Sequence, residues 1–357
     1  MISRRGAIVG FGNVAVHGHA PVWQRRGDVH IVAVADLNPE RRALVLQRFP
    51  QARVYDDPLV LLQRERLDFV DIATPPAQHV ALIMGAAAAG FHVVCEKPLV
   101  TSLDDFQDVQ SAVRGAEVTL FTVHNWKRAP QLVEALRLLD AGSIGRVRRL
   151  RLETERVGQS VAVGSQWRTD AAQAGGGILF DHGWHNFYLL LTLAREKPMR
   201  VAATVERRGG GGGNVEDTAR CVVEFPSCSG EICLTWAGRQ RRTRWFVEGE
   251  HGSIEIDENL LRLQCGGASP QTRTFDEALS AGSHHPDWFG GVIDEFFAEI
   301  DGQRPRGANL NEAGLCLTLI RLSYQSAAIG QSVNVPEELS SVVGVRPVAV
   351  PVPDRLP

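Results

Sequence analysis

Lysine is scarce in this sequence of 357 residues, which holds only Lys97, Lys127 and Lys197 among 38 basic side chains. Any reaction that needs an amine therefore has three side chains to draw on. The sequence also lacks an excess of charge of either sign, because the net charge at pH 7 is −3. No overall positive field attracts nucleic acid or an anionic membrane, so we expect neither as a partner.

Long hydrophobic runs and paired cysteines are absent as well. No stretch of about 18 uncharged apolar residues occurs, which excludes a membrane-spanning helix. The six cysteines form no Cys-x-x-Cys pair and do not cluster with histidines, so we expect neither a zinc site nor a disulfide framework. Arg4 and Arg5 precede an apolar run that is too short for an export signal, and we expect a cytoplasmic protein.

The first third of the chain alternates short apolar strands with helices. The expected strands are Ala7–Val9, Ile31–Ala35, Phe69–Ala73, Phe91–Cys95 and Val118–Val123. The expected helices are Val14–Arg26, Pro39–Phe49, Pro58–Arg64, Gln78–Ala89 and Leu103–Val113. Because the strands are apolar throughout and helices separate them, the pattern predicts an α/β domain with a doubly wound parallel sheet over residues 1–123.

The remainder of the chain is rich in strands. We expect strands at Arg146–Arg156, Arg200–Arg207, Thr218–Phe225, Glu231–Thr235, Thr243–Glu248 and Ser253–Ile256, and helices at Pro130–Leu139, Trp288–Ile300 and Leu310–Ala328. No helix separates the later strands, so they should pair antiparallel. The pattern predicts an α+β domain over residues 124–340 and a Pro-rich tail over 341–357. Gly209–Gly213 is expected to be a flexible hairpin connection.

A glycine motif follows the first expected strand and opens a helix, over Gly10–Ala15. Gly10 permits a tight turn, and Gly12 lets the backbone approach a pyrophosphate. The start of the helix, at Asn13 and Val14, offers free N–H groups to the anion. The spacing and context predict a dinucleotide-binding site.

Asp36 ends the second strand, where the motif requires an acidic residue. Its carboxylate can accept the ribose hydroxyls of NAD and repels the 2′-phosphate of NADP, so we expect NAD. Arg41 and Arg42 follow in the next helix and partly offset this repulsion, so NADP stays possible.

Two further strand ends carry polar residues toward the same edge of the sheet. Thr74, Pro75 and His79 follow one strand and are candidate cofactor contacts, although the prolines equally suit a helix start. Glu96 and Lys97 follow the next strand. A lysine there points toward the cofactor crevice, where it can bond a substrate hydroxyl and the nicotinamide ribose. The second Glu-Lys-Pro, at residues 196–198, lies in an expected turn and is assigned no function.

A second group of candidate residues follows Gly175–Gly177. Asp181 and His185 are four residues apart and share a face if the segment is helical. The imidazole can take the proton of an alcohol as hydride leaves carbon, and the carboxylate can bind a substrate hydroxyl or orient the base. The same pair suits two metal ligands, but no third ligand has a comparable position, so no metal is expected.

Several nearby residues have more than one interpretation. Trp167 and Arg168 can stack on and bond a sugar, or can be a core tryptophan beside a surface arginine. Asn125 follows an expected strand and is a candidate substrate ligand. The roles of four other residues are left open: Lys127, His182, His284 and His285.

Together these motifs resemble the glucose-fructose oxidoreductase / inositol dehydrogenase / rhizopine catabolism family, abbreviated Gfo/Idh/MocA. The resemblance rests on Gly10–Ala15, Glu96-Lys97-Pro98 and the segment Gly175–His185, and extends over nearly the whole chain. It implies a Rossmann domain followed by a large open, predominantly antiparallel sheet that forms homodimers or homotetramers. It implies NAD(P)-dependent hydride transfer on a sugar, polyol or related ring hydroxyl.

The resemblance also assigns roles to individual residues. It makes Lys97, Asp181 and His185 the catalytic trio, with His185 as general acid/base, and places Glu96 near the nicotinamide. It makes Lys97–Pro98 a candidate cis peptide. The chain departs from the family at Tyr188, where many members carry an acidic residue. Two other functions remain compatible with the motifs: an NAD-dependent glycosidase that uses transient oxidation, and a non-catalytic dinucleotide-binding regulator.

Overall fold

The computed structural model describes residues 3–158, 166–209 and 214–336. Its first sheet has six parallel strands in the order β3-β2-β1-β4-β5-β6. The strands are β1 (Arg4–Val9), β2 (Val29–Ala35), β3 (Arg53–Tyr55), β4 (Phe69–Ile72), β5 (His92–Cys95) and β6 (Leu120–Thr122). This order is that of a Rossmann domain, as the sequence predicted, with β3 as an additional short strand.

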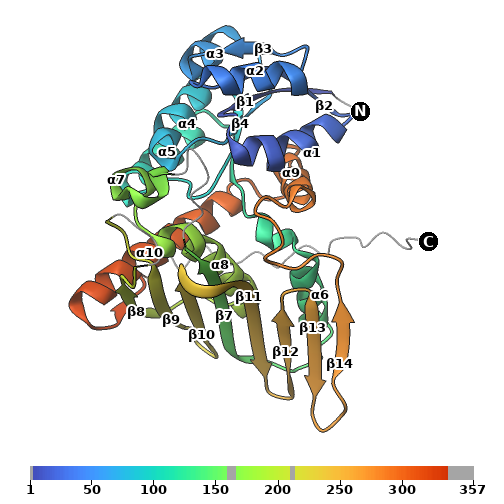
Figure 1. The fold of residues 1–357 in the computed structure, drawn as a ribbon, viewed down its shortest axis with the longest axis vertical. Coiled ribbons are helices and arrows are strands. Elements are labelled where there is room, and N and C mark those ends of the chain that lie inside the picture. Colours follow the sequence, from blue (N-terminus) through green and yellow to red (C-terminus); the bar gives the residue numbers. More distant parts are fainter. Residues whose placement is uncertain (1–2, 159–165, 210–213, 337–357) are drawn as a thin grey trace.

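The second sheet has nine strands in the order β14-β13-β12-β11-β7-β10-β9-β8-β15. They are β7 (Val147–Val157), β8 (Arg200–Glu206), β9 (Thr218–Glu224), β10 (Ser229–Thr235), β11 (Ala237–Gly249), β12 (Gly252–Asp257), β13 (Leu260–Cys265), β14 (Gln271–Thr274) and β15 (Val333–Asn334). The sheet lies open below the Rossmann domain in Figure 1.

The second sheet is predominantly antiparallel, as the sequence predicted, with one parallel pair of strands. β10 pairs with β7 in parallel, while the other pairs in the sheet are antiparallel. The chain leaves β7, passes through helix α8 (Ile178–Ala194), and returns through β8 and β9 before it forms β10. Because parallel neighbours need a long crossover, this helical excursion allows the parallel pairing. Residues 210–213 and the Pro-rich tail lie outside the described residues.

Helices cover both faces of the first sheet and one face of the second (Figure 1). The α-helices are α1 (Ala20–Arg25), α2 (Pro39–Arg48), α3 (Pro58–Arg64), α4 (His79–Ala88), α5 (Leu103–Gly115), α6 (Pro130–Asp140), α7 (Ala171–Ala174), α8, α9 (Pro286–Ile300) and α10 (Ala308–Ile329). The expected helix Val14–Arg26 is divided, because a π-helical turn, η1 (Ala15–His19), precedes α1. Short 3-10 turns are η2 (Pro76–Gln78), η3 (Asn125–Arg128) and η4 (Gln166–Thr169).

Helix α9 packs on the Rossmann domain, although the predicted division at residue 123 assigns it to the second. Phe296 is fully buried, and its ring lies 6.0 Å from that of Phe69 and 5.9 Å from that of Phe121. Phe289 joins the same cluster against Trp23. The periodic aromatic side chains of α9 therefore complete the core on one face of the first sheet.

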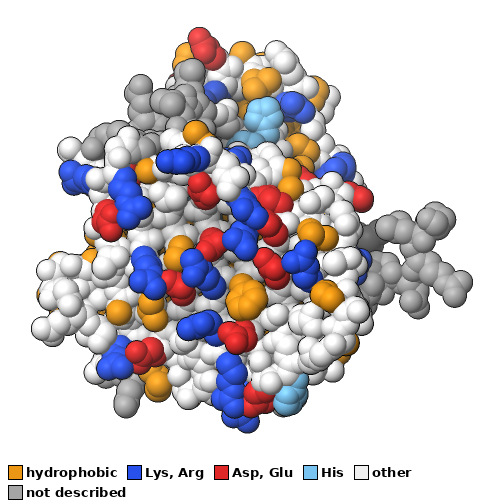
Figure 2. Space-filling model, turned by 60° about the horizontal axis from the view of Figure 1, so that its bottom comes forward, with side chains coloured by type: hydrophobic (Ala, Val, Ile, Leu, Met, Phe, Trp, Pro, Cys, Tyr) orange, Lys and Arg blue, Asp and Glu red, His pale blue; other side chains and the backbone are white. Residues whose placement is uncertain are grey.

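The outer face of the second sheet carries paired charges. Ion pairs link its neighbouring strands, among them Arg244 with Glu255 and Arg220 with Glu231. The face turned forward in Figure 2 shows basic and acidic side chains interspersed with hydrophobic ones. Among the residues that the structure describes, none of the helices has the length and apolar character needed to span a bilayer.

Loss of the ring that joins α9 to the first sheet should destabilise the protein. We expect Phe296→Ala to lower the free energy of unfolding by about 3–5 kcal/mol, because it removes a buried ring and leaves a cavity. Urea unfolding followed by tryptophan fluorescence measures this change. The control Ile329→Ala, at a side chain that is 54% exposed, should change it by less than about 0.5 kcal/mol. Equal effects of the two variants would show that α9 contributes little to the core.

Candidate active site

The glycine loop after β1 has the shape of a phosphate cradle. Gly10 adopts φ +87°, and a Cβ at this position would lie 2.7 Å from the carbonyl oxygen of Ala73. Its N–H donates to Ala35 O at 2.8 Å, which fixes the turn between β1 and β2. The first N–H groups of the following helix, at Gly12, Asn13 and Val14, are those that a helix start leaves free for an anion. The loop thus fits the pyrophosphate of a dinucleotide.

Asp36, the residue expected to bind the ribose of the cofactor, also holds this loop in place. Its carboxylate accepts hydrogen bonds from the N–H groups of Phe11 at 2.6 Å and Asn38 at 2.8 Å. Further lone pairs of a carboxylate stay available to ribose hydroxyls. The guanidinium of Arg41 lies 3.7 Å from the carboxylate and packs beside Gly12. An acidic and a basic group therefore share the place where NAD and NADP differ.

The side chain of His79, a candidate cofactor contact, is bound within the protein. The ring is fully buried, and its nitrogens lie 2.9 Å from the carbonyl oxygens of Thr74 and Leu99. His79 therefore holds the loop that contains Thr74 and Pro75 against the segment after Lys97. Thr74 Oγ1 is buried and has no hydrogen-bond partner among the described residues.

Lys97 joins the two domains. It follows β5, precedes a cis peptide bond to Pro98 as the resemblance implied, and donates from Nζ to Asp181 Oδ1 at 2.7 Å and to the Asp181 carbonyl at 3.1 Å. Asp181 lies in the first turn of α8, where the helix dipole favours an anion. The sequence predicted both residues in one site, and the structure brings them into contact.

Asp181 lies in a positive environment. Burial alone would raise the pKa of this carboxyl, but the charges of Lys97 and Arg168 outweigh burial and hold the pKa well below its usual range. Arg168 Nε lies 4.0 Å and His182 Nδ1 lies 3.4 Å from the carboxylate. Burial also lowers the pKa of His182 to about 3, so this imidazole is neutral. The Asp181 carboxyl is therefore ionised at neutral pH.

The glycines before α8 allow close approach of other side chains, and Gly177 makes room for Glu216. A Cβ at Gly177 would overlap the Glu216 carbonyl, and one at Gly176 would overlap the Tyr324 hydroxyl. The Glu216 carboxylate accepts from the N–H groups of Gly177 and Leu179 and from Tyr324 Oη. Glu216 therefore caps the N-terminus of α8 and fixes the position of Asp181 one turn later.

His185 lies on the second turn of α8, with Nδ1 2.7 Å from the hydroxyl oxygen of Tyr188. The Tyr188 hydroxyl also accepts from the Trp126 N–H at 3.1 Å, and the Trp126 indole stacks on the imidazole with ring centroids 5.1 Å apart. Burial, followed by the charge of Lys97, lowers the pKa of His185 well below 6.5. His185 is a neutral ring clamped between two aromatic residues.

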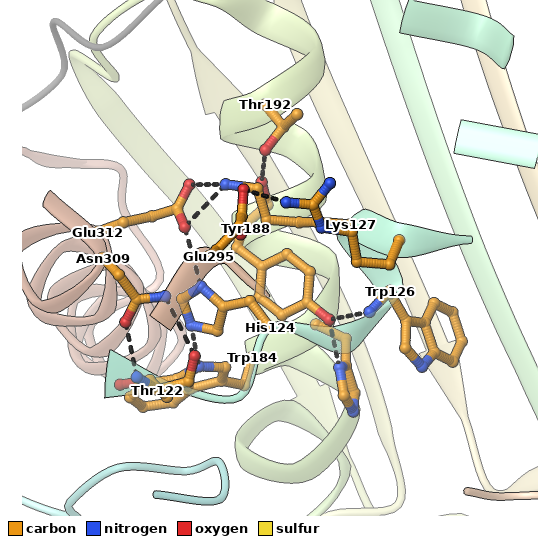
Figure 3. A network of polar contacts seen from close by, with 12 residues as sticks. Thr122, His124, Trp126, Lys127, Trp184, Tyr188, Thr192, Glu295, Asn309 and Glu312 are labelled. Atoms are coloured by element: carbon orange, nitrogen blue, oxygen red, sulfur yellow. Dashed lines mark hydrogen bonds and ion pairs between the residues drawn. The ribbon is translucent and has the colours of Figure 1, made fainter. Parts of the chain in front are cut away.

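Behind Tyr188 lies a polar network that Figure 3 shows from close by. His124 stacks on the Tyr188 ring at 4.3 Å and contacts Glu312 at 2.8 Å, and Lys127 binds both oxygens of Glu312. Trp184 donates to His124 Nε2. Lys127, whose role the sequence left open, therefore neutralises the half-buried carboxylate of Glu312.

A second buried network lies beneath Glu96. His19, at the end of the π-helical turn, places Nδ1 3.0 Å from both oxygens of Asp71 and Nε2 3.0 Å from Glu96 Oε1. Trp23 donates to Asp71 as well. Burial by itself lowers the pKa of His19, but the charges and hydrogen bonds of Asp71 and Glu96 raise it to about 10. An imidazolium thus joins two carboxylates below the cofactor-binding edge.

The other candidate residues differ in the contacts that they make. Asn125 begins η3, and its Oδ1 is buried without a hydrogen-bond partner among the described residues. Trp167 is half-buried under the guanidinium of Arg168, 4.4 Å from its ring. His284 lies against Gly18 of the π-helical turn, whereas His285 stacks on Trp288 at the start of α9.

Sequence reasoning missed three contributors to this site. Asp71 stands within an otherwise apolar strand, Phe69–Ile72, and a charged residue there signals a buried partner. Glu216 follows the glycine run but gave no sign of capping a distant helix. His19 lies within the expected helix Val14–Arg26, and no sequence pattern distinguished it from its neighbours.

Comparisons with known proteins show the family of this chain. Residues 4–124 match the model of an oxidoreductase family with an NAD-binding Rossmann fold, and residues 132–255 match the GFO/IDH/MocA C-terminal domain. The chain therefore belongs to the Gfo/Idh/MocA family, as its motifs predicted. It is an NAD(P)-dependent oxidoreductase.

Named relatives act on sugars. Levoglucosan dehydrogenase of Pseudarthrobacter phenanthrenivorans is 28% identical over 281 residues, 71% of this chain and 72% of that protein. D-apiose dehydrogenase of Paraburkholderia graminis is 35% identical over 141 residues, 40% of this chain, so the match spans only 37% of that relative. A solved levoglucosan dehydrogenase, in complex with NADH and levoglucosan, shares the fold with a TM-score of 0.81 at 21% identity, over 94% of this chain and all of that one.

The buried imidazolium makes stability depend on pH. Because the pKa of His19 is about 10 in the folded protein and about 6.5 in the unfolded chain, its contribution is complete below pH 6.5 and is lost as the pH rises toward 10. We expect His19→Gln to cost about 3–5 kcal/mol at pH 6, because Asp71 loses its counter-ion.

Urea unfolding between pH 6 and 10 measures both effects. The stability deficit of His19→Gln should shrink steadily toward pH 10, whereas the exposed His30→Gln should follow the wild type at every pH. A deficit that stays constant across this range would mean that His19 is neutral in the folded protein.

Proposed function

We propose that this protein transfers a hydride between a ring hydroxyl or ketone of a sugar or polyol and NAD, with NADP as a possible second cofactor. The observation that carries the proposal is the Lys97–Asp181 pair, in which an ammonium from the cofactor-binding edge meets a carboxylate from the second domain at 2.7 Å. The relatives named above are sugar dehydrogenases, which favours hydride transfer over the glycosidase and regulator alternatives.

Each residue of the trio has a distinct task in this proposal. Bound NAD supplies the carbon that accepts or returns the hydride. Asp181 remains charged and binds a neighbouring hydroxyl, and Lys97 hydrogen-bonds the reacting oxygen and lowers the pKa of the hydroxyl. His185 contacts the same oxygen through Nε2 and is the sequence-based candidate for acid/base catalysis. Trp126 and Tyr188 keep the imidazole fixed.

The substrate subsite would combine a flat aromatic surface with polar groups, as sugars require. Trp167 offers the stacking surface, while Arg168 and Asn125 offer a donor and an unpaired acceptor. The charged outer face of the second sheet would join copies of the chain as a homodimer or homotetramer, because interleaved charges of both signs are self-complementary across a twofold axis.

A substrate screen combined with Lys97 variants tests this function. Absorbance of the reduced nicotinamide should rise with NAD and at least one compound from a panel of sugars, inositols and sugar acids. Lys97→Arg and Lys97→Met should then lower kcat by a factor of about 10²–10⁴, because a guanidinium is too bulky and too basic to replace the amine.

The matched control is Lys197→Arg, which changes the exposed lysine of the second Glu-Lys-Pro and should keep wild-type rates. Nicotinamide reduction at wild-type rates in Lys97→Arg would refute the role of Lys97. Bound NAD without turnover on any panel member would refute the dehydrogenase assignment.

A further inference from the structure

The hydroxyl group of Tyr188 lies within hydrogen-bond distance of His185 Nδ1. Tyr188 is fully buried, and its oxygen has two polar neighbours in the described part of the chain: the Trp126 N–H at 3.1 Å and His185 Nδ1 at 2.7 Å. A backbone N–H can only donate, so the phenol oxygen is the acceptor toward Trp126. The phenolic proton must then be donated elsewhere, and His185 Nδ1 is the acceptor within reach.

A hydrogen bond donated by His185 Nδ1 to the Tyr188 oxygen is disfavoured, because it would leave one donor unsatisfied. If His185 donated from Nδ1, the phenol oxygen would accept twice and its own proton would remain buried without an acceptor, which folded proteins avoid. His185 Nδ1 therefore holds the lone pair, and the ring proton lies on Nε2. Nε2 has no hydrogen-bond partner among the described residues and stays available to a bound molecule.

Counting donors and acceptors in the same way determines the tautomer of His124, whose ring packs against Tyr188. An indole N–H can only donate, so Trp184 makes His124 Nε2 an acceptor, and His124 Nδ1–H donates to Glu312. His124 is therefore a neutral ring stacked 4.3 Å from Tyr188, and the Lys127–Glu312 ion pair closes the network behind it (Figure 3). The stacked His124 ring thus packs against the Tyr188 ring without offering its hydroxyl a further acceptor.

The charges around His185 also oppose a second proton on its ring. The ionisable groups that influence it from the surrounding elements are Lys97, Asp181, His182 and His124. Burial and Lys97 lower the pKa of His185, and Asp181 opposes this only in part. An acidic side chain in place of Tyr188 would accept a hydrogen bond from a protonated Nδ1, and its negative charge would stabilise an imidazolium. A phenol with a raised pKa offers no such charge.

We propose that Tyr188 is a positioning residue that holds His185 neutral with its proton on Nε2, so that His185 donates a hydrogen bond to the reacting oxygen while Lys97 exchanges the proton. The inference rests on the proposed function. In the resting site Lys97 is the ammonium partner of Asp181, so oxidation begins when Lys97 releases one proton to solvent. The substrate O–H bond then breaks as an N–H bond forms on the amine. In the reduction direction the ammonium returns that proton. His185 keeps its single proton and its charge throughout.

Nitrogen NMR of the full-length protein with ¹⁵N-labelled histidine tests the tautomer without any need for turnover. The His185 resonances, identified by their loss in His185→Gln, should show an unprotonated Nδ1 and a protonated Nε2 from pH 6 to 9. Tyr188→Phe should shift His185 Nδ1 toward a mixture of protonated and unprotonated forms. The control Tyr55→Phe, which removes a hydroxyl bound to Glu65 far from this ring, should leave the His185 resonances in place.

A protonated Nδ1 in the wild type, or an imidazolium near pH 7, would overturn the inference even if the enzyme turns over sugars. Because the wild-type spectrum decides this point, a Tyr188→Phe variant that failed to fold would not affect the test. Conversely, a spectrum as expected from a protein that oxidises no panel substrate would leave the tautomer established and the proposed function refuted.

Kinetics then separate the two proton-transfer candidates. His185→Gln keeps an N–H donor but cannot take up a proton, so kcat should fall only about tenfold and the pH profile of kcat should keep its shape. Lys97→Met should lower kcat by a factor of about 10²–10⁴ and abolish the limb of that profile that reports the amine. The reverse pattern, with His185→Gln the more damaging change, would show that His185 exchanges the proton.

Discussion

The contact between Lys97 and Asp181 is the interaction on which the site depends. One partner lies at the end of a parallel strand, and the other lies in the first turn of a helix from the second domain, so neither domain contains the pair by itself. Each partner is held by its own support. His79 ties the loops beside Lys97, and Glu216 caps the helix that carries Asp181. Misplacement of either support would separate the two charges.

The parts of this protein that follow from local sequence rules were predicted well. Apolar strands separated by helices gave the parallel sheet, and the glycine loop with Asp36 gave the dinucleotide site, because both depend on residues close together in the chain. The spacing of Asp181 and His185 likewise predicted a shared helix face. These features need no knowledge of long-range packing.

The remainder depends on contacts between distant segments. The parallel pairing of β7 with β10 depends on how the strands of the whole sheet assemble, and no local sequence pattern encodes it. His79 is a residue type that often binds ligands, but both of its ring nitrogens lie against backbone carbonyl groups. The partners of His19 and Glu216 lie tens of residues away in the sequence. Buried charges can be suspected from sequence, while their counter-ions emerge only from the fold.

Helix α9 has a consequence for the order of folding. Its aromatic side chains fill the face of the first sheet that Phe69 and Trp23 leave apolar, yet it ends at residue 300. During synthesis the ribosome releases the N-terminal sheet long before this helix exists. The nucleotide-binding half is therefore incomplete as a nascent chain, and its hydrophobic face stays exposed until most of the polypeptide has emerged. Completion of this hydrophobic core therefore waits for the synthesis of α9.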